Sequence, residues 1–98
     1  MRGPEFVILI LHRKIHDISA KEITMVTEDM ARAVHAAWME ARRADGWTYG
    51  QMRNDAMKQT PCLVPYDQLP ADEKAYDYAT AEAVIAKLKE MGYEIRKS

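Results

Sequence analysis

Apolar residues recur at helical spacing in two segments of the chain, which predicts two amphipathic helices. In the first segment, residues 28–45, Thr27 is the predicted N-cap and Gly46 is the predicted stop. His35 lies one residue beyond the apolar stripe and is expected to flank it. The predicted stripe consists of Met30, Val34, Ala37, Trp38 and Ala41.

The second segment begins at Pro70, a favourable first-turn residue, and ends before Gly92, a favourable residue after a helix. Asp77 and Thr80 are alternative caps for a fresh start partway, so one helix and a short helix followed by a longer one both stay open. The predicted stripe consists of Ala81, Val84, Ile85, Leu88 and Met91.

Residues 46–70, between these helices, are rich in rigid and aromatic residues. Pro61 and Pro65 stiffen the stretch "TPCLVPYDQLP", and Leu63 is expected to pack in a short apolar plug beneath Tyr66 and Leu69. Two helices of this size carry little apolar area, so this connection should supply the rest of the core. The pattern predicts two helices with the connection packed against them.

The first half of the connection mixes aromatic faces with charged groups, and two interpretations of it stay open. Aromatic faces can stack on a planar base while Arg or Lys meets phosphate oxygens. The same residues could instead form a tryptophan anchor beside a surface ion pair between Arg53 and Asp55. The candidate ligand-binding residues are Trp47, Tyr49, Arg53, Asp55, Lys58 and Tyr66.

Catalytic and metal-binding signatures are absent from the sequence. There is no P-loop, no GxGxxG and no zinc spacing. Cys62 stands in an apolar run that indicates burial rather than thiolate reactivity, and no motif places a nucleophile beside His35. We therefore expect a protein that is not an enzyme and that uses no cofactor or metal.

Composition narrows the range of partners. Ninety-eight residues allow one domain, and a net charge of −1 argues against nucleic-acid binding. The apolar run at residues 6–11 is too short to span a membrane. With a single cysteine the chain forms no internal disulfide, which fits a reducing compartment. We expect a cytoplasmic protein without nucleic-acid or membrane partners.

Residues 1–24 are expected to be an extension of vector and upstream origin. "MRGPEF" is typical of a translated cloning site, and "AKEITM" is typical of a translated ribosome-binding site followed by a start codon. The single domain is therefore predicted to cover residues 25–98.

Residues 34–93, "VHAAWMEARRADGWTYGQMRNDAMKQTPCLVPYDQLPADEKAYDYATAEAVIAKLKEMGY", resemble the ryanodine receptor repeat, or RyR domain. The most specific stretches are "GWTYG", "RNDAMKQTPCLVPYDQLP", "EKAYD" and "LKEMGY". The resemblance implies a mainly α fold, with two principal helices flanking a long structured loop and minor short β-strands. It also implies a binding or interaction module that is not an enzyme, here of the single-copy type known from bacteria and phages.

The resemblance also implies a ligand. In the paired repeats of calcium-release channels, the tryptophan of a Gly-Trp-x-Tyr motif from each repeat helps to clasp an adenine nucleotide. Trp47 matches that position and Tyr49 lies beside it, while Arg53 and Lys58 are our own assignment to phosphates. Because this chain has one repeat, a two-fold homodimer would have to supply the second tryptophan. The alternative is a protein-interaction or self-association module with Trp47 and Tyr66 as anchors.

Overall fold

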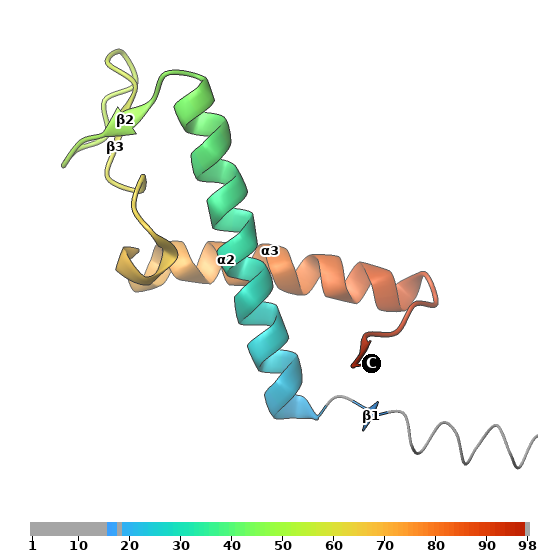
Figure 1. Ribbon diagram of the computed structural model, residues 1–98. Coiled ribbons are helices and arrows are strands. Elements are labelled where there is room, and N and C mark those ends of the chain that lie inside the picture. The colour runs from blue at the N-terminus through green and yellow to red at the C-terminus, as the bar shows by residue number, and fades with distance from the viewer. Residues whose placement is uncertain (1–15, 18, 98) are drawn as a thin grey trace, which may run out of the picture.

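Two long helices that cross near their midpoints dominate the computed structural model, which describes residues 16, 17 and 19–97 (Figure 1). The predicted mainly α fold with minor strands is confirmed. The apolar run at residues 6–11 lies outside the described residues. In chain order the elements are β1 (His16–Asp17), α2 (Ala20–Ala44), β2 (Thr48–Tyr49), β3 (Gln59–Thr60), the 3-10 helix η1 (Tyr66–Gln68), α3 (Ala71–Glu90) and β4 (Arg96–Lys97).

Helix α2 begins earlier than predicted. Its N-cap is Ser19, which forms a capping box with Glu22, the Glu22 amide donating to Ser19 Oγ at 3.2 Å. Thr27, the predicted cap, is instead buried inside the helix, and its hydroxyl donates to the Ile23 carbonyl at 2.7 Å. The prediction was wrong because the Ser-x-x-Glu signal lies in a segment that was assigned to the extension. The predicted stop is confirmed, since Gly46 has a φ of +89°.

Helix α3 is uninterrupted, so the alternative of a fresh start partway is wrong. The Thr80 hydroxyl donates to the Tyr76 carbonyl at 3.0 Å, which is an interaction of the helix interior rather than a cap. Pro70 is the N-cap residue, one position before the helix. At the other end Gly92, at φ +94°, donates to the Lys89 carbonyl and Tyr93 donates to the Leu88 carbonyl, which completes a Schellman motif.

The buried face of α2 is not the predicted stripe. Thr27, Ala31 and His35 are buried, whereas Ala37 and Ala41 are exposed. Met30, Val34 and Trp38 are half-buried. The face shifted because α3 and the connection pack on the row that contains Ala31, where the small side chain allows close approach. His35 can be buried there because it finds polar partners, which the hydrophobic pattern does not register.

The prediction for α3 is partly confirmed. Ala81 and Ile85 are buried, while Val84 and Met91 are exposed. Ala31 and Ala81 are both 0% exposed, and by residue number each lies near the midpoint of its helix. The connection contributes Leu63 and Leu69 to the core, as expected.

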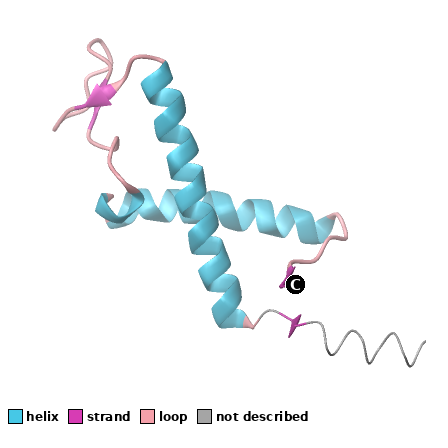
Figure 2. Ribbon diagram, in the orientation of Figure 1, coloured by secondary structure: helices cyan, strands magenta, loops and turns pink. Residues whose placement is uncertain are grey.

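Two short strand pairs complete the fold (Figure 2). Strands β1 and β4 pair antiparallel and bring the two ends of the described chain together. Strands β2 and β3 pair parallel, with Tyr49 opposite Thr60. Gly50 allows this pairing, because a Cβ there would lie 2.9 Å from Gln59 Cβ.

Candidate functional site

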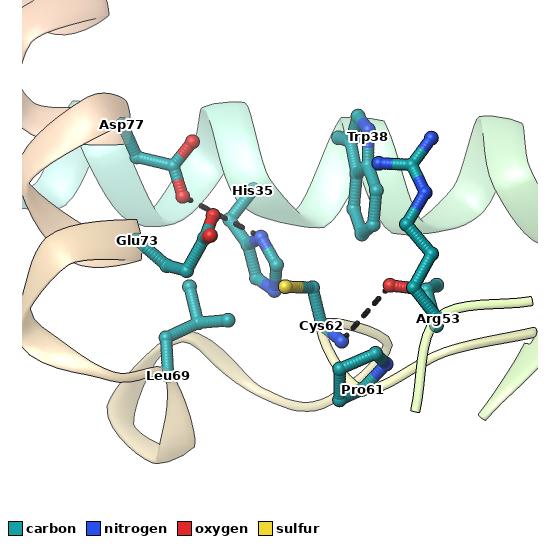
Figure 3. Close-up of a pocket in the computed structure, with 9 residues that line it drawn as sticks. His35, Trp38, Arg53, Pro61, Cys62, Leu69, Glu73 and Asp77 are labelled. Carbon is teal, nitrogen blue, oxygen red and sulfur yellow. Dashed lines mark hydrogen bonds and ion pairs between the residues drawn. The ribbon is translucent and has the colours of Figure 1, made fainter. Parts of the chain in front are cut away.

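A pocket of about 340 Å³ lies where α2, α3 and the connection meet (Figure 3). Helix α2 contributes the rings of His35 and Trp38, and α3 contributes the carboxylates of Glu73 and Asp77. Arg53 enters from the connection on the side opposite the two carboxylates. The remaining lining residues are Thr60, Pro61, Cys62 and Leu69.

His35 is the buried centre of this pocket, with 3% of its surface exposed. Its Nε2 lies 2.7 Å from the Val64 carbonyl oxygen, and because a carbonyl only accepts, Nε2 carries a proton and donates. The other ring nitrogen, Nδ1, lies 3.5 Å from Asp77 Oδ2. That contact is an ion pair only when the imidazole carries a second proton.

Asp77 is half-buried beside this imidazole. Burial raises the pKa of Asp77 above its ordinary value, and the opposing charge of His35 only partly lowers it. His35 connects three parts of the fold, because it lies on α2, donates to Val64 in the connection and lies beside Asp77 on α3. It also stacks on Trp38, with ring centroids 5.5 Å apart.

Cys62, His35 and Asp77 line one pocket and are the residue types of a thiol-hydrolase triad. Two observations argue against that chemistry. His35 Nε2 is occupied by its bond to Val64, so it has no lone pair with which to take the thiol proton. Burial raises the pKa of Cys62, and the negative charge of Glu73 raises it further. The thiol is therefore protonated at neutral pH and lacks a base.

We expect Cys62 to react slowly with iodoacetamide at pH 7.5, compared with free cysteine, because a raised pKa lowers its thiolate fraction. The rate should climb steadily with pH beyond the range in which free cysteine levels off. Mass spectrometry reports on this residue alone, since it is the only cysteine. In 6 M guanidinium the difference should vanish. A rate that matches or exceeds that of free cysteine in the folded protein, with a plateau below pH 8, would contradict the assignment.

Of the six residues predicted from sequence to bind a ligand, one lies on this pocket, namely Arg53. Arg53 also pairs with Asp55, its Nε lying 2.7 Å from Asp55 Oδ1. Tyr66 belongs to a different cluster, in which Arg32 and Lys74 lie 5.0 and 5.8 Å from its ring centroid. The structure therefore does not bring the six residues into one cavity.

Trp47 forms part of a stack that extends outward from the pocket. The Arg42 guanidinium lies 5.2 Å from the Trp47 ring and 5.5 Å from the Trp38 ring. The order along this stack is therefore His35, Trp38, Arg42 and Trp47. Trp47 is half-buried, and its amide donates to the Arg42 carbonyl at 2.9 Å.

Two more of the predicted residues lie near Trp47. Tyr49 is 55% exposed on β2. Lys58 donates to the Asp45 carbonyl at 2.8 Å and lies 3.7 Å from Asp45 Oδ1, just before Gly46 and Trp47 in the chain. The Thr48 amide, between Trp47 and Tyr49, donates to the Lys58 carbonyl at 2.9 Å. Trp47, Tyr49 and Lys58 are therefore neighbours, and we call these three residues the Trp47 face.

Sequence reasoning missed most of the pocket. His35 with Trp38 and Glu73 with Asp77 show the i,i+3 and i,i+4 spacings of shared helix faces, which is a visible signal. That those two faces meet, and that Cys62 lies between them, follows only from the crossing of α2 and α3. Within residues 19–97, no three His, Cys, Asp or Glu side chains come together as a metal site.

Neither described helix is long and apolar enough to cross a membrane.

Comparison with known proteins places the chain in a family. Residues 15–97 match the family model of the RyR domain, and this match includes every described residue. Members of this family are non-catalytic modules that bind ligands or partners. The chain belongs to the RyR domain family.

Proposed function

We propose that this chain is a binding module for an adenine nucleotide or a related nucleotide signal, with the base held on the Trp47 face. The observation that carries the proposal is the position of the Arg42 guanidinium, 5.2 Å from the centroid of the Trp47 ring. The Trp47 ring is half-exposed. A fixed and partly exposed indole loses little conformational entropy when a base stacks on it. Tyr49, 55% exposed and two residues further on, offers a second aromatic surface.

Charged groups suited to the rest of a nucleotide lie near this surface. The Lys58 ammonium is held at the backbone of Asp45, so it can meet a phosphate without a large rearrangement. Arg53 lines the pocket rather than the Trp47 face, so Lys58 is the cation that serves a nucleotide here. Asp55 is 69% exposed at its side chain and offers carboxylate oxygens to ribose hydroxyls.

A second copy of the chain would complete the base-binding site. One Trp47 covers one face of a base, and a two-fold axis beside the Trp47 face would bring the partner's Trp47 to the other. We therefore propose that nucleotide binding promotes a homodimer.

The test is a thermal-shift and calorimetry panel on the full chain, with ATP, ADP, AMP, cyclic nucleotides, NAD and ADP-ribose. One ligand should raise the melting temperature, since saturation at a hundred times Kd adds roughly 2.7 kcal/mol to the free energy of unfolding. Trp47→Ala should abolish this shift because it removes the stacking surface. Tyr76→Ala is the matched control, since it removes an exposed aromatic residue on α3. An equal shift in parent and Trp47→Ala, or none with any nucleotide, would refute the proposal.

A second candidate function is protein interaction or self-association, favoured by the loop between β2 and β3. Met52 is 80% exposed and Met57 is 65% exposed in this loop. The loop is braced, because Asn54 and Gln59 exchange two backbone hydrogen bonds of 2.9 Å each. Exposed methionines on a rigid loop are typical of binding surfaces. In this alternative Trp47 and Tyr66 act as anchors, and a concentration-dependent dimer that ignores every nucleotide would favour it.

A further inference from the structure

We propose that the pocket between α2 and α3 is a second binding site, for a compact ligand with an ammonium group at one end and a carboxylate or phosphate at the other. It is separate from the Trp47 face and does not depend on nucleotide binding. Its lining comes from α2, the connection and α3, with the acidic groups and the guanidinium on opposite sides (Figure 3).

The α3 side of the pocket suits an ammonium group. Within the described chain the Glu73 carboxylate forms no ion pair, although the residue is half-buried. Its charge reaches the pocket interior, where it contributes to the raised pKa of Cys62. Glu73 therefore adds a negative charge to this side of the pocket, beside the carboxyl group of Asp77. An ammonium would neutralise that charge and donate to the carboxylate oxygens.

The opposite side suits an oxyanion. Arg53 Nε donates to Asp55 Oδ1 at 2.7 Å, and the remaining N–H donors of the guanidinium can meet a carboxylate or phosphate. A ligand with amines at both ends would meet this guanidinium with a like charge. The chemistry therefore selects a zwitterion over a diamine.

The lining also includes the apolar side chains of Pro61 and Leu69 and the thiol of Cys62. The Cys62 thiol is neutral, so these side chains can pack against methylene groups. A cavity of about 340 Å³ is at the small end of ligand pockets, which favours a short aliphatic molecule.

A nucleotide fits this pocket poorly. The Trp38 ring already stacks on His35, and the Arg42 guanidinium lies 5.5 Å from its centroid. Little of the Trp38 ring is therefore left for a base. Nucleotide phosphates would also meet the unpaired charge of Glu73. The pocket and the Trp47 face therefore take different ligand classes.

The test uses titration calorimetry on the full chain with four probes: phosphoethanolamine, γ-aminobutyrate, putrescine and inorganic phosphate. The two zwitterions supply the phosphate and carboxylate forms of the oxyanion, and at least one should bind. The diamine and the phosphate ion should each bind at least about tenfold more weakly, a difference of about 1.4 kcal/mol. Putrescine binding as tightly as both zwitterions, or no detectable binding of either zwitterion, would overturn the proposal.

Variants locate the site. Glu73→Gln should weaken zwitterion binding at least about tenfold, since it removes the charge that meets the ammonium. Glu82→Gln, on an exposed position of the same helix, should leave it unchanged. Trp47→Ala should also leave it unchanged, whereas Glu73→Gln should not affect nucleotide binding, so each proposal can fail without the other. Equal zwitterion affinity in the parent and in Glu73→Gln would place the ligand elsewhere and refute the assignment.

Discussion

Replacing His35 with alanine is expected to lower the free energy of unfolding by about 3 kcal/mol. The side chain is 3% exposed, so its loss leaves a cavity where α2 meets the connection. The Val64 carbonyl loses a donor at 2.7 Å, and Asp77 loses its imidazole neighbour at 3.5 Å. Trp38 also loses its stacking partner. A loss of this size is a large fraction of the stability of a small domain.

The measurement is urea unfolding followed by circular dichroism. His35→Gln is the informative companion, because its amide can still donate to Val64 although it cannot stack on Trp38. The free energy of unfolding of His35→Gln should lie between those of the parent and His35→Ala. A loss below about 1 kcal/mol for His35→Ala would mean that the connection is held by other contacts and that His35 does not organise the pocket.

Replacing Ala81 with leucine is expected to destabilise the fold by about 2 kcal/mol, through overpacking. Ala81 and Ala31 are both completely buried, each near the midpoint of its helix by residue number, and the helices cross near their midpoints (Figure 1). A leucine there has no space unless α2 and α3 move apart, which would also disturb Ile85 and the pocket. Thermal unfolding of the variant should show a clear drop in melting temperature.

The matched control is Ala83→Leu, on the same helix at an exposed position. It adds the same atoms in solvent, so the free energy of unfolding should change by no more than about 0.5 kcal/mol. Equal melting temperatures for Ala81→Leu and Ala83→Leu would show that the crossing tolerates a larger side chain.

The two helices, their stops and the family could be predicted from sequence, because the signals for them are local. Gly46 and Gly92 end helices since glycine adopts positive φ at little cost, whatever the chain does elsewhere. The signal for the start of α2 is equally local, because it is the capping box of Ser19 and Glu22. The start was missed because these residues belong to the predicted extension. The role of the Trp47 face stays a prediction drawn from the RyR resemblance.

The sequence by itself determined that this protein has two helices joined by a stiff connection that completes the core. Only the tertiary structure decided which side of α2 is buried. That side contains His35, a polar residue that burial tolerates because Val64 and Asp77 supply its partners. The pocket likewise exists only through the crossing, which brings Glu73 and Asp77 to residues almost forty positions earlier in the chain. Periodicity describes the faces of one helix, whereas contacts between helices depend on where small residues such as Ala31 and Ala81 allow close approach.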